Sequence, residues 1–190
     1  MKKKHFGCGP YSLIMLLALA LVLFAFFYYR QHILRYFYPL NYQAQVEVIA
    51  KEYEIDPWLI YAIIRMESDF KLRAESPAGA RGLMQLMPST AQWITEVAGF
   101  NLSEEDIWLP ENNIRLGCWY IDWLRDYYNG DMVIAVAAYN AGMSNVNSWI
   151  ASGVWNGNLQ ELSGIPFSET RKYISHVYES YNMYHNLYGE

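Results

Sequence analysis

A run of 19 uncharged residues, Tyr11 to Tyr29, most constrains how this 190-residue chain can fold. As an α-helix the run would measure about 28 Å at about 1.5 Å per residue, which matches the hydrocarbon core of a bilayer. We therefore predict two parts. Residues 1–40 form a basic tip, a transmembrane helix at about 11–29 and a short linker, and residues 41–190 form one domain with its own core.

The flanks of this run predict its orientation. Lys2, Lys3 and Lys4 precede it, which places the N-terminus in the cytoplasm and the domain outside a single-pass membrane anchor. A cleaved signal peptide is the alternative, but the bulky end of the run (Phe26-Phe27-Tyr28-Tyr29) is a poor cleavage site.

The two cysteines should lie on opposite sides of the membrane. Cys8 precedes the apolar run, whereas the cysteine of a lipoprotein would follow it. Cys118 falls on an apolar helical stripe and is expected to pack as a small hydrophobic residue. No intrachain disulfide is therefore expected.

Charge divides the chain in the same way. Five basic residues and no acid lie in residues 1–40, while residues 41–190 carry nine basic and 19 acidic residues, a net charge of −10. An acidic domain is a poor partner for nucleic acid, because phosphate contacts require basic side chains. A glycan, which is held by hydrogen bonds and aromatic faces, is compatible with it.

Apolar periodicity after residue 40 is helical, and no convincing strand pattern of period two is present. The fold class is therefore all-α. The expected helices are a segment after Asn41, one from Pro57 to Glu67, a short one through Trp93, a long one from Pro110, an apolar one from Met132 to Tyr139, one from Ser144 to Ile150, and a last one capped by Ser168.

Glu67 is the candidate catalytic residue. It ends the helix opened by Asp56-Pro57 and shares an apolar face with Ile60, Ile63 and Ile64. Partial burial and the negative end of the helix dipole should both raise its pKa, as a general acid requires. From the helix pattern alone, a solvated glutamate at a fraying helix end remains the alternative.

Four segments in order carry a family resemblance. They are Glu67-Ser68-Asp69-Phe70, the glycine-rich stretch from Ser76 to Ala91, Ala137-Ala138-Tyr139-Asn140-Ala141-Gly142, and Pro166 to Tyr173. Together they resemble the lytic transglycosylases of the soluble lytic transglycosylase type, relatives of goose-type lysozyme. The resemblance spans roughly residues 38–188 and implies a lysozyme-like helical fold around a long groove.

The resemblance also implies a chemistry that one acid can perform. In this chemistry Glu67 protonates the β-1,4 oxygen between N-acetylmuramic acid and N-acetylglucosamine, the muramic acid 6-hydroxyl attacks the anomeric carbon, and Glu67 accepts the hydroxyl proton. The product is a 1,6-anhydromuramic end. Glycosidases usually need two carboxylates, but Asp69 should face elsewhere on the helix and Glu75 reads as a surface acid.

Further site residues follow from the resemblance, each with a structural alternative. Ser76, Gln85, Met87, Tyr139 and Asn140 would bind the substrate, with Tyr139 against the sugar and Glu67. Ser76 could instead be a turn residue and Tyr139 a satisfied core tyrosine. The resemblance gives Glu169 and Tyr173 supporting positions in the groove, although Glu169 in a first helical turn could simply complement the helix dipole.

The sequence therefore predicts a membrane-anchored peptidoglycan lytic transglycosylase that faces the cell wall. A hydrolytic muramidase is the rival enzyme, and a non-catalytic glycan-binding module of an envelope complex is the rival from another class. No cofactor is expected, and the four dispersed histidines give no metal-ligand spacing.

Overall fold

The computed structural model describes residues 10–189 and divides between Pro39 and Leu40 into two units, each taken by itself below. The described residues are helical with no β-strand. Two isolated bridges occur within residues 10–189, and they join Arg81 to Glu75 and to Leu86. The predicted all-α class is therefore confirmed.

The first unit contains one helix, α1 (Pro10–Phe37). It continues past the predicted end at Tyr29, because the polar residues that follow include no helix breaker. By length and composition it is the one described helix able to cross a membrane. The predicted cytoplasmic tip, with Lys2, Lys3, Lys4 and Cys8, lies outside the described residues.

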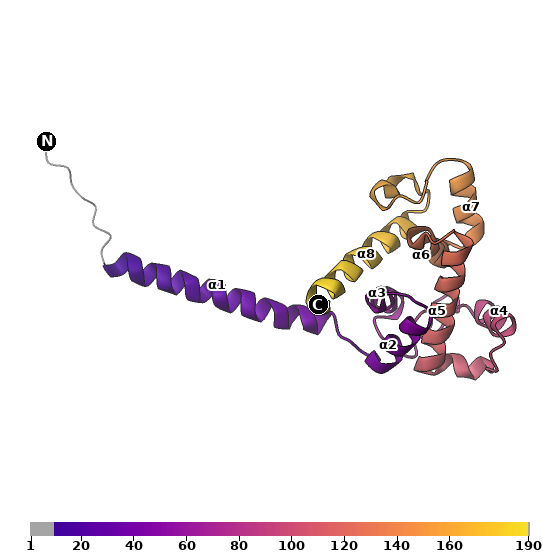
Figure 1. Ribbon diagram of the computed structural model, residues 1–190, viewed down its shortest axis with the longest axis horizontal. Helices are drawn as coiled ribbons and strands as arrows, with labels where there is room; N and C mark the ends of the chain where they lie inside the picture. The colour runs from indigo at the N-terminus through magenta and orange to yellow at the C-terminus, as the bar shows by residue number, and fades with distance from the viewer. Residues whose placement is uncertain (1–9, 190) are drawn as a thin grey trace. The chain divides into compact units, whose positions relative to one another are not determined.

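The second unit is a helical domain (Figure 1). Its elements are α2 (Gln43–Glu52), α3 (Pro57–Ser68), α4 (Pro88–Ala98), the 3-10 helix η1 (Glu104–Trp108), α5 (Pro110–Tyr127), α6 (Met132–Ala141), α7 (Met143–Ala151), the 3-10 helix η2 (Leu159–Gly164) and α8 (Ser168–Tyr188).

Helix α3 lies at the centre of this domain. The Asp56 carboxylate accepts a hydrogen bond from the Trp58 backbone nitrogen at 2.9 Å, and Pro57 occupies the first turn. Every residue from Leu59 to Ile64 is buried, which is typical of a helix surrounded by others. The helix ends at Asp69, whose φ of 49° is left-handed, so Glu67 stands at the rim of the core.

Local caps fix the starts of several elements, and one of them differs from the expectation. The Asp131 carboxylate caps α6 by accepting from the Ile134 nitrogen at 3.0 Å. Ser103 and Asp106 form a capping box at the start of η1. The N-cap of α8 is Phe167, and Ser168 is already the first helical residue.

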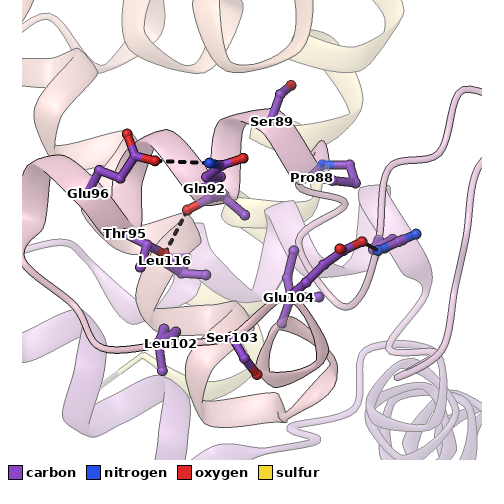
Figure 2. Close-up of a pocket in the computed structure, with 12 residues that line it drawn as sticks. Pro88, Ser89, Gln92, Thr95, Glu96, Leu102, Ser103, Glu104 and Leu116 are labelled. Atoms are coloured by element: carbon purple, nitrogen blue, oxygen red, sulfur yellow. Dashed lines mark hydrogen bonds and ion pairs between the residues drawn. The ribbon is translucent and has the colours of Figure 1, made fainter.

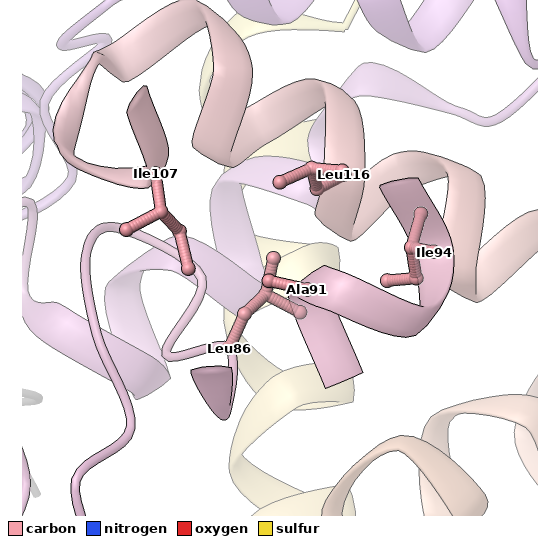
Figure 3. Close-up of a cluster of buried hydrophobic side chains, with 5 residues drawn as sticks. All are labelled: Leu86, Ala91, Ile94, Ile107 and Leu116. Carbon is pink, nitrogen blue, oxygen red and sulfur yellow. The ribbon is translucent and has the colours of Figure 1, made fainter. Parts of the chain in front are cut away.

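A cluster of buried side chains joins α4, η1 and α5 to the end of the glycine-rich stretch (Figure 3). Leu86, Ala91, Ile94, Ile107 and Leu116 make up this cluster. Cys118 of α5 is also buried, like Ile121 one turn further on, as a small hydrophobic residue should be. The cluster thus fixes one end of the stretch that carries several candidate site residues.

Candidate active site

The Glu67 side chain lies at the end of α3, where α8 passes it. The Tyr173 hydroxyl of α8 donates a hydrogen bond to Glu67 Oε1 at 2.6 Å. Burial raises the pKa of Glu67 to about 7, and the bond from Tyr173 only partly opposes this, because it favours the carboxylate. The raised pKa agrees with the expectation from sequence and gives Glu67 a proton to donate near neutral pH.

A second tyrosine, Tyr139 of α6, lies close to this pair. Its hydroxyl donates to the Met84 carbonyl at 2.7 Å. Burial raises the pKa of both Tyr139 and Tyr173, and the nearby charge of Glu67 raises each further. Both phenols therefore stay protonated and can act as donors. The structure gives the direct contact with Glu67 to Tyr173, whereas the resemblance implied this position for Tyr139.

Polar side chains from three helices hold the loop that carries Met84. Ser68, buried at the end of α3, donates from Oγ to the Leu83 carbonyl at 2.8 Å. Asn113 of α5 accepts from the Met84 nitrogen at 2.7 Å and donates to the Arg81 carbonyl at 3.1 Å. With Tyr139 on the Met84 carbonyl, both backbone groups of Met84 are bonded. The loop beside Glu67 is therefore held in one arrangement.

Two glycines permit the close approach of this loop to α5. A Cβ atom on Gly82, which has a φ of 80°, would lie 2.2 Å from Asn113 Nδ2. A Cβ atom on Gly117 would lie 2.2 Å from the sulfur of Met84. Neither contact can be accommodated without displacing a buried side chain.

Ser76 and Gln85 shape the backbone of the glycine-rich stretch. Ser76 Oγ accepts from the Ala80 nitrogen at 3.0 Å and closes a tight turn. Gln85 has a left-handed φ of 47°, and its amide nitrogen donates to the carbonyls of Ala74 and Gly82 at 3.0 and 2.9 Å. These bonds direct the Gln85 amide nitrogen into the loop. Met87, at the start of α4, is exposed.

Asn140 and Glu169 line a different part of the molecule, a pocket of about 490 Å³. The pocket lies between the end of α6 and the first turn of α8. Pro166, Phe167 and Thr170 also line it. Asn140 and Glu169, which come from the third and fourth family-like segments, thus line one pocket.

The acids closest to Glu67 in sequence are exposed and paired. Asp69 lies 3.8 Å from the Lys71 ammonium, and Glu75 lies 3.6 Å from the Arg81 guanidinium. Neither shapes the pKa of Glu67, whose shift comes from burial and Tyr173. Within residues 10–189, no three His, Cys, Asp or Glu side chains gather as a metal site.

A larger pocket, about 610 Å³, lies between α4 and η1 (Figure 2). Its lining does not include Glu67 or either tyrosine of the site. The charged and amide groups in it already bond one another: Arg81 pairs with Glu104 at 2.6 Å, and Gln92 donates to Glu96 at 2.9 Å. The pocket therefore offers no group poised for glycoside chemistry.

Comparison with known proteins places this chain in a family. The family model of the transglycosylase SLT domain matches residues 45–159. The soluble lytic murein transglycosylase of Escherichia coli is 33% identical over 155 residues, which cover 77% of this chain and 24% of that protein. Membrane-bound lytic murein transglycosylase C of Actinobacillus pleuropneumoniae is 36% identical over 116 residues, which cover 56% of this chain and 32% of that protein.

A solved structure agrees with these sequence matches. An inactive mutant of the lytic transglycosylase Slt from Pseudomonas aeruginosa superposes with a TM-score of 0.72 and 34% identity, covering 80% of this chain and 25% of that one. The predicted lysozyme-like transglycosylase fold is confirmed. The chain belongs to the transglycosylase SLT family. It spans about a quarter of the length of the soluble relatives that it matches.

Proposed function

We propose that this chain is a peptidoglycan lytic transglycosylase that cleaves the β-1,4 bond between N-acetylmuramic acid and N-acetylglucosamine. The observation that carries the proposal is the single half-buried acid Glu67, whose pKa is raised to about 7, in a chain of the transglycosylase SLT family. The neighbouring acids Asp69 and Glu75 are exposed and paired, so no second carboxylate adjoins Glu67 from this stretch. One acid suffices when the substrate supplies the nucleophile.

In the proposed reaction Glu67 acts first as acid and then as base. It donates its proton to the glycosidic oxygen as the bond from that oxygen to the anomeric carbon breaks. The 6-hydroxyl of the same muramic acid forms the new bond to the anomeric carbon, and its proton returns to Glu67. Between the two transfers Glu67 is a carboxylate, which the hydrogen bond from Tyr173 stabilises. No water is consumed, and a 1,6-anhydro end results.

The remaining candidates would hold the strand. We assign substrate contacts to Ser76, Gln85, Met87, Tyr139 and Asn140, with Glu169 at the far side of the Asn140 pocket. Support comes from the shared pocket of Asn140 and Glu169 and from the position of Tyr139 beside Glu67. Holding the sugar so that its 6-hydroxyl stays near the anomeric carbon is a positioning contribution.

The reaction is tested by the products formed from purified cell wall. Transglycosylation should give muropeptides about 18 Da lighter than hydrolysed ones, with no new reducing ends. In water enriched in heavy oxygen the new ends should stay unlabelled. One heavy oxygen per cut would identify a hydrolytic muramidase instead.

The assignment of the acid is tested by Glu67→Gln, which keeps the shape and the acceptor for Tyr173 but has no proton to donate. Turnover should fall by about two orders of magnitude or more. The matched controls Asp69→Asn and Glu75→Gln remove exposed carboxylates nearby and should retain turnover. A Glu67→Gln protein with near wild-type turnover would refute the assignment.

We further propose that α1 is an uncleaved single-pass anchor for the domain of residues 41–190, with the N-terminus in the cytoplasm and the domain facing the wall. The apolar length of α1 and the family relative named as membrane-bound support this. Full-length protein should fractionate with membranes and be cut by protease added from outside. A soluble form that starts near residue 30 would instead indicate a cleaved signal.

A further inference from the structure

Helices α4 and α5 carry a group of aromatic rings, here called the aromatic surface, made of Trp93, Trp119, Tyr120, Trp123 and Tyr127. The rings of α5 are nearly parallel. The interplanar angle is 14° between Trp119 and Trp123, 18° between Tyr120 and Trp123, and 22° between Trp123 and Tyr127. Trp93 of α4 stands edge-on to them, with its ring centre 5.0 Å from that of Trp123. The rings thus form an ordered array rather than a random cluster.

The array is only partly covered by protein. Tyr127 is 50% exposed, and the three tryptophans are half-buried, although α5 has a separate buried face formed by residues such as Ile114 and Ile121. The Tyr127 ring is nevertheless fixed, because its hydroxyl accepts a hydrogen bond from Asn147 of α7 at 3.1 Å. Ordered aromatic side chains that face solvent are typical of binding surfaces.

The aromatic surface is continuous with the candidate active site. Tyr120 lies 5.5 Å, centre to centre, from Tyr139, the tyrosine whose pKa responds to Glu67. From Tyr120 the rings continue along α5 to Trp123 and Tyr127. A shallow pocket of about 280 Å³ beside them combines the rings of Trp93, Tyr120 and Trp123 with Ser89, Thr90 and Met143.

We propose that the aromatic surface binds the sugar rings of the glycan strand beyond the bond that is cleaved. This inference rests on the proposed function. Flat, ordered rings next to hydroxyl donors suit a pyranose, which presents C–H groups on its face and hydroxyls at its edge. The charges nearby are self-paired or acidic: Asp122 bonds Arg125, and the domain is acidic overall, which disfavours an anionic lipid surface as the occupant.

The test uses the full chain in detergent micelles with Glu67→Gln, so that binding is measured without cleavage. The probes are β-1,4-linked oligomers of three and six N-acetylglucosamine units, followed by calorimetry. Trp119→Leu and Trp123→Leu should each raise the Kd of the hexamer about tenfold, as the loss of a tryptophan contact in a binding surface does. The trimer should be affected less, because it spans fewer sites.

Trp58→Leu is the matched control, because Trp58 is a half-buried tryptophan of α3 that stacks on Tyr61 and Tyr188, away from α4 and α5. Its hexamer affinity should equal that of the parent chain. A second measurement needs no surface substitution: bound hexamer should reduce acrylamide quenching of tryptophan fluorescence in the Glu67→Gln chain. Unchanged quenching at saturating hexamer would overturn the inference even if a leucine variant failed to fold.

The outcomes separate this inference from the proposed function. Anhydro products together with normal hexamer binding by the leucine variants would overturn the aromatic surface alone. Weakened binding by these variants together with hydrolysed products would support the surface and refute transglycosylation. Two further outcomes would overturn the inference by showing another occupant of the aromatic surface. A leucine variant that loses self-association but keeps its hexamer affinity would reveal an interface between copies. Quenching of Trp119 and Trp123 fluorescence by brominated lipid would reveal a membrane contact.

Discussion

Glu67 should make the stability of the folded protein depend on pH. Its pKa is raised from an ordinary 4.5 to about 7, so folding disfavours the carboxylate. Below about pH 4.5 Glu67 is protonated in both the folded and the unfolded chain, and the folded protein has its full stability. As the pH rises from about 4.5 to about 7, the unfolded chain ionises first, so the free energy of unfolding falls. At about 1.4 kcal/mol per pKa unit, the loss amounts to about 3 kcal/mol of unfolding free energy.

The perturbation that isolates this contribution is Glu67→Gln, which stays uncharged at every pH and can still accept from Tyr173. The unfolding free energy of each protein would be measured by urea denaturation at pH 4, 6 and 8, with circular dichroism as the signal. The variant minus wild-type difference should grow by about 3 kcal/mol across this range, because every other group is common to both chains and cancels.

Asp69→Asn provides the control, since it removes an exposed carboxylate at the end of the same helix. It gives the background for losing one charge in this region. A Glu67→Gln difference that stayed flat between pH 4 and 8 would mean that Glu67 ionises as an ordinary glutamate, and the argument for a proton donor near neutral pH would fail.

Three further predictions concern the surroundings of Glu67. Tyr173→Phe removes the hydrogen bond that lowers the pKa of Glu67, so this pKa should rise further. The alkaline limb of the pH–rate profile should then move to higher pH, and an unmoved limb would contradict the role of this bond. Asn113→Leu leaves the Met84 nitrogen and the carbonyls of Arg81 and Ile107 without their partner, so urea denaturation should show the unfolding free energy falling by about 3 kcal/mol or more. A fall below about 1 kcal/mol would mean that other contacts hold the loop. Gly117→Ala brings a methyl group against the sulfur of Met84, and thermal melting should show a destabilisation of about 1–3 kcal/mol. An unchanged Tm would show that the helix and the loop are not in close contact here.

The sequence was sufficient to predict the helices and the environment of Glu67, because these depend on local signals. Asp56-Pro57 and Asp131 mark helix starts through caps that reach only two or three residues, and the apolar spacing of Ile60, Ile63 and Ile64 already places Glu67 at the edge of the core.

The contacts that complete the site could not be read in the same way. Ser68 and Asn113 bond to Leu83 and Met84 over 15 and 29 residues, and their identities alone do not indicate which distant backbone groups they meet. The contact between Tyr173 and Glu67 likewise depends on how α8 packs on α3. A polar residue at the end of an otherwise apolar helix was the only available signal for Ser68, and Asn113 had none.

The hydrogen bond between Tyr173 and Glu67 joins residues 106 positions apart, and the burial that raises the pKa of Glu67 requires the core around α3. In an unfolded chain Glu67 is an ordinary glutamate, ionised at neutral pH and unable to donate a proton. Glu67 therefore becomes a proton donor near neutral pH only in the folded domain. The proposed proton donor is therefore absent from an unfolded chain and is formed only once α8 has packed against α3.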